Sequence, residues 1–334
     1  MSFKRLDPED ISISAESIVG PLWSTGNVTL TSFFTGSQVN TNTGNFYYDI
    51  YQASTTGVHD TQFSIAYGHK EGKGAEPYNS LVTGKSTTST IYGQYRNLVF
   101  GNEDTDFVFG TVTSNDFYVI NVDRARYKEK LFPGTFNLKL KNRANNKVLD
   151  LTDDSKSTST INFVDSGRVF EIISGSNGVP HTDGETGYSA ANGSYGKFLP
   201  DVGVIILNAS ALDASDGLSL VTDEAVDGTA NNLNKLFSLI FEGASFKLQS
   251  EETISSNYIF VRVRNGEFNY TTNPSFTTGS GELRYDVLVN QPQTYITTVG
   301  LYNDNNDLLG VAKLSRPLLK DFTKEALVRI KLDY

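Results

Sequence analysis

Residues 295–317 read YITTVGLYNDNNDLLGVAKLSRP, and this stretch decides the fold class of the chain. Two apolar segments flank the polar run 303–307, a pattern that predicts two antiparallel strands joined by a hydrated turn. The chain then ends on KEALVRIKLDY (324–334), in which apolar residues alternate with charged ones. This period of two predicts a last strand with one apolar face and one wet face. The C-terminal part of the chain is therefore expected to be β-sheet.

Similar patterns continue toward the N-terminus. Arg264-Asn265-Gly266 follows an apolar segment, and Asn-Gly supplies the two positive φ angles of a type I′ turn, so a hairpin between 258–263 and 267–270 is predicted. Apolar residues at helical spacing predict one helix over 91–99 and another over 233–240, and a charged segment predicts a short helix over 123–131. The other main strands are predicted at 46–51, 62–67, 107–109, 116–122, 136–140, 169–173 and 202–207.

Together these elements predict a mainly β protein, with β-sandwich-like sheets, long loops and two or three short helices. Aromatic residues make up 12% of the chain, and 29 glycines accompany them, which is typical of many short strands on irregular loops. We expect an extended N-terminal arm over 1–40, a β-rich core domain formed by 41–140 and 244–334, and an inserted or middle β lobe over 141–243. An equally good interpretation of the arm is an edge strand of the chain's own sheet.

The composition removes much of the usual catalytic chemistry. Zero Cys excludes disulfides, thiolate nucleophiles and Cys-ligated metals, and three His leave little for a transition-metal site. The formal charge of −10 disfavours phosphate backbones, so no direct nucleic-acid partner is expected. No segment approaches the roughly 20 apolar residues that cross a bilayer, and no signal peptide is recognisable, so we expect no membrane insertion and synthesis in the cytoplasm.

Individual motifs add no site. Gly84-Lys85-Ser86 resembles the end of a phosphate loop, but Asn79 stands where that loop needs its first glycine. Acidic residues on turns do not match the spacing of a calcium loop. A Ser-His-Asp site built across the fold and a paired-carboxylate glycosidase stay open as enzyme alternatives without supporting residues. We therefore expect no enzyme and predict no catalytic, cofactor-binding or metal-binding residues.

The quoted C-terminal stretch resembles a pattern of tailed-phage tail proteins. In tail-fibre attachment and baseplate chains, a strand ending in Gly-Leu-Tyr/Phe meets an acidic turn and returns through Leu-Leu/Ile-x-Val-Ala. With FSIAYGH (63–69), IYGQYRNL (91–98) and RARYKEK (124–130), the whole chain resembles virion structural proteins of contractile-tailed, cyanophage-like bacteriophages. No long fibre shaft and no fixed-period repeat is present, which favours a compact subunit over a fibre.

The resemblance implies a non-enzymatic structural subunit of the virion tail, most simply a baseplate or tail-fibre-attachment component made in the host bacterial cytoplasm. Its partners would be other tail or baseplate proteins and copies of itself, joined through sheet edges and the N-terminal arm. A capsid decoration or neck protein is one alternative, and a host-surface carbohydrate-binding module is another.

The predicted interface residues come from the arm and from the polar turn 303–307. For the aromatic residue Trp23 the competing interpretation is a core anchor, and for the turn it is a solvated loop. The full predicted set is Trp23, Phe33, Phe34, Asn303, Asp304, Asn305, Asn306 and Asp307.

Overall fold

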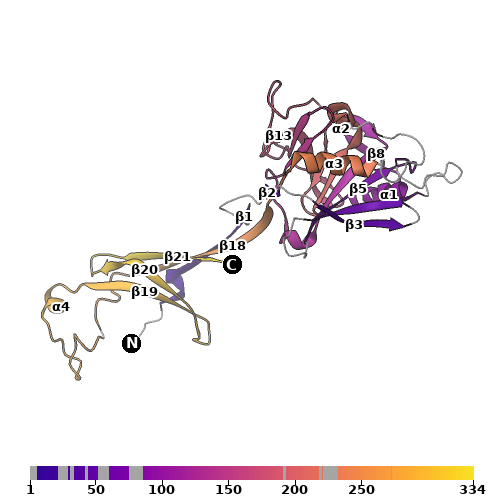
Figure 1. The fold of residues 1–334 in the computed structure, drawn as a ribbon. Coiled ribbons are helices and arrows are strands. Elements are labelled where there is room, and N and C mark those ends of the chain that lie inside the picture. The colour runs from indigo at the N-terminus through magenta and orange to yellow at the C-terminus, as the bar shows by residue number, and fades with distance from the viewer. Residues whose placement is uncertain are drawn as a thin grey trace. The chain divides into compact units, whose positions relative to one another are not determined.

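The computed structural model describes residues 6–21, 29–30, 34–41, 44–51, 60–74, 86–190, 193–217, 220, 232–271 and 273–334. The chain forms two compact units (Figure 1). The large unit is Gly20–Glu252, and the small unit combines Met1–Val19 with Thr253–Tyr334. Both units are built mainly from antiparallel strands, with a few short helices, so the predicted fold class is confirmed.

The large unit is organised by one long sheet in the strand order β2-β17-β10-β11-β13-β15-β16-β8-β5-β4-β3. Smaller strands lie beside it, and the described residues of the unit also form three α-helices. The sheet strands are β2 (Thr29–Leu30), β3 (Phe34–Thr41), β4 (Gly44–Tyr51), β5 (Thr61–His69), β8 (Asp116–Val122), β10 (Asn137–Lys141), β11 (Val148–Asp153), β13 (Gly167–Ser176), β15 (Gly196–Leu199), β16 (Val204–Asn208) and β17 (Ser245–Lys247). The others are β6 (Phe107–Phe109), β7 (Val112–Ser114), β9 (Lys130–Leu131), β12 (Asn162–Val164), β14 (Val179–Pro180), α1 (Thr87–Phe100), α2 (Ala209–Asp216) and α3 (Asn232–Gly243).

The middle of this sheet is buried on both faces. In β16, Ile205 and Leu207 join one apolar cluster and Val204 and Ile206 join another on the opposite face. A nearly continuous apolar strand is the pattern expected when both faces are covered. Helices α2 and α3 contribute to the first cluster, and α1 with β6 contributes to the second. The large unit therefore holds a deep core in which aromatic rings pack against β-branched and aliphatic side chains.

Two of the three predicted helices are confirmed. α1 contains the predicted 91–99 stripe and ends at Gly101, which adopts the left-handed conformation (φ 66°) that favours glycine at a helix end. α3 contains the predicted 233–240 segment. The predicted helix over 123–131 is wrong: only Arg124–Arg126 forms a single 3₁₀ turn, because Asp123 caps it and Tyr127 is already extended.

The small unit has two layers. A sheet contains β1 (Ile11–Pro21), β18 (Ser250–Val263) and β21 (Ala326–Asp333) in the order β1-β18-β21, and β19 (Thr294–Tyr302) and β20 (Leu308–Lys320) form a hairpin. A one-turn helix, α4 (Val287–Asn290), lies in the connection between β18 and β19. The predicted C-terminal hairpin and the last alternating strand are both confirmed.

The core of the small unit lies where the hairpin meets the sheet. Register pairs Val261 with Val328 and Ile259 with Ile330, which places these side chains on one face. Val299, Leu301, Ala312, Leu314 and Leu318 of the hairpin pack against that face. In Figure 1, β20 lies between β21 and β19, in agreement with this packing.

Two predictions about chain organisation are corrected. The strand over 258–263 does not form a hairpin with 267–270, which is a turn region closed by the hydrogen bond from the Glu267 amide to the Arg264 carbonyl. β18 pairs with the distant β21 instead, because their alternating apolar residues cover the same core.

The predicted domain division also differs from the two units. Strands of 141–243 continue the sheet of 41–140, since β16 pairs with β8 in the register Ile205 to Ile120, and so 141–243 is no separate lobe. The segment 244–334 is divided between the units. After a 3₁₀ turn at Pro8–Asp10, the described part of the predicted arm consists of strands in the chain's own sheets, with β1 at the edge beside β18, as in the alternative interpretation.

Candidate interaction surface

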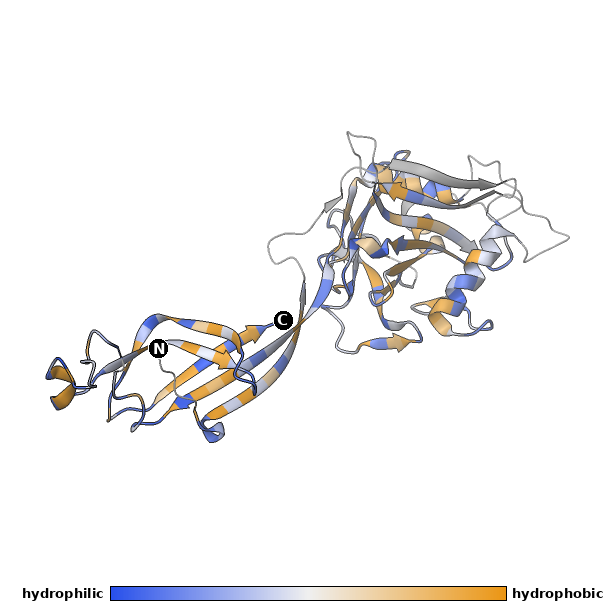
Figure 2. Cartoon of the chain, turned by 90° about the horizontal axis from the view of Figure 1, so that it is seen from below, coloured by the Kyte–Doolittle hydropathy of each residue, from blue (hydrophilic) through white to orange (hydrophobic). Residues whose placement is uncertain are grey.

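The small unit exposes many large apolar side chains over a small core. Its buried hydrophobic residues are Val261, Val263, Ala326, Val328 and Ile330. Among the described residues, 27 large hydrophobic side chains are exposed, and 20 of them belong to the small unit. Figure 2 shows apolar residues in orange along the strands of the unit that carries both termini, and α4 is also orange. Such a concentration of exposed apolar surface is typical of an interaction site.

The outward face of the hairpin carries one well-defined part of this surface. We call Tyr302, Leu308, Leu309 and Val311 the hairpin patch. All four are exposed, and Leu309 keeps 71% of its surface in contact with solvent. A Cβ built on Gly300 would lie 2.8 Å from the Tyr302 ring and 3.5 Å from Leu308, so these two side chains lie together over the glycine. The hairpin is thus apolar on both faces, although only its inner face has a core to pack against.

The outer strands of the small unit differ in whether they carry residues that prevent pairing with a strand of another molecule. Natural proteins protect exposed edges with charges and prolines. β21 carries Arg329, Lys331 and Asp333, and β20 carries charged residues and Pro317. β1 has one central charge, Glu16. β19, TYITTVGLY, has neither a charged residue nor a proline, and in the described part of the chain β20 is the strand that pairs with it.

A buried ion cluster fixes the N-terminal segment to this unit. Asp10 is closed to solvent, and Arg262 Nη2 and Arg264 Nε lie 2.8 Å from its two carboxylate oxygens. Burial alone would raise the pKa of Asp10, but the hydrogen bonds and charges of the two arginines outweigh it and hold the pKa below its usual value. The start of β1 is therefore held against β18 by charge as well as by strand pairing.

The predicted interface residues meet different outcomes. Trp23 and Phe33 lie outside the described residues. Phe34 begins β3, where its backbone pairs with Tyr51. The turn 303–307 lies at the tip of the hairpin and is closed on itself, as in the solvated-loop interpretation. Asn303 Oδ1 accepts from the Asp307 amide at 2.8 Å, and Asn303 Nδ2 donates to Asp307 Oδ2 at 2.9 Å.

The sequence-based prediction selected the polar turn 303–307 and did not identify the apolar residues of the hairpin patch beside it. The sequence does contain a pattern that indicates the patch. In Leu308-Leu309-Gly310-Val311-Ala312, apolar residues occupy consecutive positions, so both faces of the strand are apolar. In the structure this pattern leaves the outward face of the hairpin apolar and exposed.

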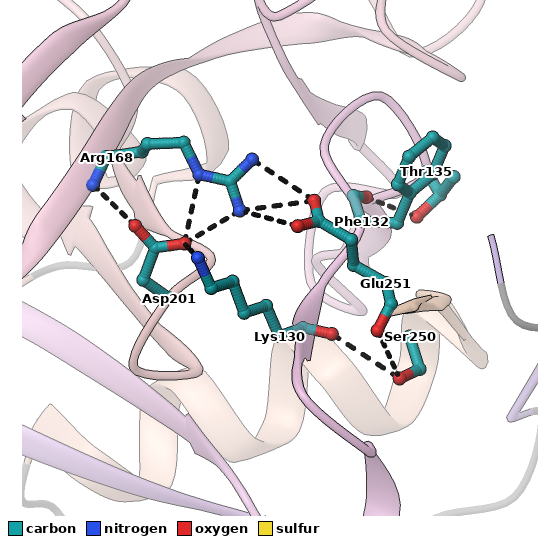
Figure 3. A network of polar contacts seen from close by, with 7 residues as sticks. All are labelled: Lys130, Phe132, Thr135, Arg168, Asp201, Ser250 and Glu251. Atoms are coloured by element: carbon teal, nitrogen blue, oxygen red, sulfur yellow. Dashed lines mark hydrogen bonds and ion pairs between the residues drawn. The ribbon is translucent and has the colours of Figure 1, made fainter. Parts of the chain in front are cut away.

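A second polar network lies in the large unit (Figure 3). Arg168 in β13 reaches Asp201 through Nη2 at 2.7 Å and Glu251 at 3.1 Å. Lys130 also approaches Asp201, at 3.6 Å. Burial works against ionisation of Asp201, but the hydrogen bonds and charge of Arg168 prevail and keep its pKa below its usual value. Glu251, at the beginning of β18, belongs to the large unit, so the network lies within that unit.

This network is structural in its geometry. All acceptors of Arg168 are carboxylates of the chain itself, and the Ser250 hydroxyl accepts from the Lys128 amide at 2.9 Å. A substrate would have to break these bonds in order to contact the guanidinium. We therefore assign the network to stability.

The ring orientation of His69 bears on the Ser-His-Asp alternative. His69 Nδ1 accepts a hydrogen bond from the Glu71 amide at 3.0 Å. A Ser-His-Asp triad needs this nitrogen to donate to a carboxylate, so His69 is not arranged as a catalytic base. Among the described residues, no three or more His, Cys, Asp or Glu side chains are grouped to hold a metal ion. No helix in the described ranges has the length and apolarity to cross a membrane.

An open hollow of about 200 Å³ lies between β13 and the segment that precedes β15, and its tyrosines make it the candidate for sugar binding. Its lining includes Ser174, Tyr188 and Tyr195. Tyr195 is buried, and its hydroxyl lies 2.6 Å from the Ser215 hydroxyl. Its ring is therefore enclosed in the core and does not offer a stacking platform for a sugar.

Comparisons with known proteins add no assignment to this geometry. No family model, no curated protein and no solved structure matches the chain.

Proposed function

We propose that this chain is a non-enzymatic structural subunit of a contractile-tailed phage virion, located in the tail or baseplate, and that its small unit makes the assembly contacts. The observation that carries the proposal is the excess of exposed large apolar side chains in the small unit, whose described residues include five buried hydrophobic ones. The C-terminal hairpin segment resembles tail-fibre attachment and baseplate chains, and this resemblance is the reason for proposing a phage tail as the assembly.

The formal charges of the two units also support assembly contacts through the small unit. The small unit holds eleven Lys and Arg residues against twelve Asp and Glu residues, a formal charge of −1. The large unit holds 17 against 26, a formal charge of −9. A nearly neutral, apolar surface associates readily, whereas a strongly acidic one repels its copies and keeps the particle surface soluble.

Mass spectrometry of density-purified phage particles tests the proposal. The particles should come from the phage whose genome encodes the chain. The chain should be present at a constant ratio to the tail-tube protein through successive purification steps, and immunogold label against it should lie on the tail. Its loss on purification would overturn the virion role. Label on the head would instead favour a capsid decoration or neck protein, and specific binding to a glycan array would favour the carbohydrate-binding alternative.

A further inference from the structure

We infer that β19 pairs in an antiparallel manner with β19 of a second copy of this chain, about a two-fold axis between Thr297 and Thr298. The inference names one partner within the assembly role proposed for the small unit, and therefore rests on that role. The site is the outer edge of a nine-residue strand that carries no charged residue and no proline. Such an edge presents a row of backbone donors and acceptors to any incoming strand.

The other outer strands fit a symmetric pairing less well. In a two-fold antiparallel pair, a strand meets its own copy about its centre. For β1, which runs from Ile11 to Pro21, the central residue is Glu16, so self-pairing would bring two carboxylates together. Like charges directly opposite each other destabilise a pair of strands. β20 and β21 carry several charged residues, and β20 also carries Pro317, which are the features that protect exposed strand edges from pairing.

The sequence of β19 is complementary to itself in one register. A bulge leaves Thr297 and Thr298 exposed in succession, so that Ile296 and Val299 both lie toward the inner face. Opposite residues of antiparallel strands share a face of the sheet. When the axis passes between the two threonines, Ile296 of one copy meets Val299 of the second, and Tyr295 meets Gly300.

Each of these contacts is of a kind that stabilises a sheet. Ile296 opposite Val299 is an aliphatic cross-strand pair, and each threonine has the other threonine opposite it. Tyr295 would lie opposite Gly300, over which the Tyr302 ring of that copy lies, so two aromatic rings would come together there. Tyr295 is 61% exposed in the single chain, so the second copy would give this ring its cover.

Charge argues that the partner is a second copy. The small unit is close to neutral, so two small units approach without the repulsion that would separate two large units, each with a formal charge of −9. The inner faces of two paired hairpins would extend the same apolar layer. The dimer needs no other protein to complete it.

Analytical ultracentrifugation of the full-length chain tests the inference with two matched variants. Thr298→Lys places a charge on the proposed edge, and Ser315→Lys places the same charge on the opposite strand of the hairpin; both positions are exposed. The wild type and Ser315→Lys should be dimers, and Thr298→Lys should dimerise at least about tenfold more weakly. Unchanged circular dichroism would show that all three chains are folded.

Disulfide cross-linking tests the register itself. Because the chain contains no cysteine, every disulfide that forms must involve the introduced residues. Co-expressed Ile296→Cys and Val299→Cys chains should form a disulfide-linked heterodimer. Neither variant should cross-link alone, because three residues of strand separate the like positions by roughly 10 Å. A monomeric wild type, or a dimer that survives Thr298→Lys and does not form the 296–299 cross-link, would overturn the pairing. Either result would leave the virion role to be decided by the particle analysis.

Discussion

Arg262 Nε donates a hydrogen bond to Asp10 Oδ1 at 2.9 Å across 252 positions of sequence. The carboxylate is closed to solvent and also meets Arg264, so the segment around Asp10 and residues 253–334 belong to one folded unit. The small unit therefore needs both ends of the chain. Either end alone lacks part of the sheet that packs against the hairpin.

Asp10→Asn should lower the stability of the small unit, because it leaves two arginines beside a group that cannot carry the compensating charge. Asp7→Asn is the matched control, since Asp7 is exposed and lies 3.7 Å from Arg264 Nη1. Urea unfolding, followed by the fluorescence of a probe on the small unit, should show a lower midpoint for Asp10→Asn and almost no change for Asp7→Asn. Equal midpoints for all three proteins would contradict the role of the ion cluster.

The contribution of Asp10 should depend on pH with a definite sign. Because its folded pKa lies below the unfolded value of about 3.8, its stabilisation is fully present above that value and is lost as the pH falls through the lower folded pKa. The difference in unfolding free energy between wild type and Asp10→Asn should stay constant from pH 7 to about pH 5 and close in stronger acid. A difference that grows on acidification would have the wrong sign.

Arg168→Leu should destabilise the large unit by about 3 kcal/mol at neutral pH, because it leaves Asp201 and the nearly buried Glu251 facing each other without their cation. Lys130→Met, which removes a half-exposed partner 3.6 Å from Asp201, should cost less than about 1 kcal/mol. Equilibrium denaturation of the three proteins measures both values. Similar costs for the two substitutions would show that the arginine is not the centre of the network.

Phe117→Ala should cost about 3–5 kcal/mol, because it removes a fully buried ring from the aromatic cluster against α1. The Phe117 ring lies 4.6 Å from Phe107 and 5.1 Å from Tyr92, measured between centroids. Phe163→Ala removes the same side chain from an exposed position, 70% accessible, and should change stability by no more than about 0.5 kcal/mol. Calorimetry of both variants measures the contrast, and a small effect at Phe117 would mean that the core is loosely packed there.

Leu309→Gln should leave folding unchanged within about 0.5 kcal/mol and reduce incorporation of the chain into particles. Leu309 is 71% exposed in the hairpin patch, so its side chain contributes little to the stability of the isolated chain. Complementation of a phage lacking the gene, followed by quantification of the chain in purified particles, checks the second part. Leu327→Gln on β21 is a matched exposed control. Full incorporation of Leu309→Gln would remove the hairpin patch from the assembly surface.

The sequence predicts those parts of the fold in which a local period persists. Val328 and Ile330 alternate with Arg329 and Lys331, and the strand forms as expected because one face meets a core. Asn265-Gly266 also looks decisive, yet no hairpin forms there. β18 gains more by pairing its long apolar face with β21 than by folding back on the polar 267–270 segment. Which distant strand provides that apolar partner is not encoded in a local pattern.

The candidate surface was less accessible to sequence reasoning. A polar tip such as Asn303 to Asp307 is conspicuous, but the structure shows that its side chains satisfy each other. The exposed state of Leu308, Leu309 and Val311 depends on how small the opposing core is, and that becomes visible only after β18, β21 and the hairpin are assembled. The joining of 41–140 and 141–243 in one sheet depends in the same way on the pairing of β8 with β16.

Electron cryo-microscopy of intact particles tests the central claim most directly. The account predicts density for this chain in the tail or baseplate, with the hairpin patch of Tyr302, Leu308, Leu309 and Val311 buried against a neighbouring subunit and the acidic large unit facing outward. Particles in which no tail or baseplate density fits the chain would contradict the claim. Density in which the hairpin patch faces solvent while the large unit makes the contacts would contradict the assembly role of the small unit.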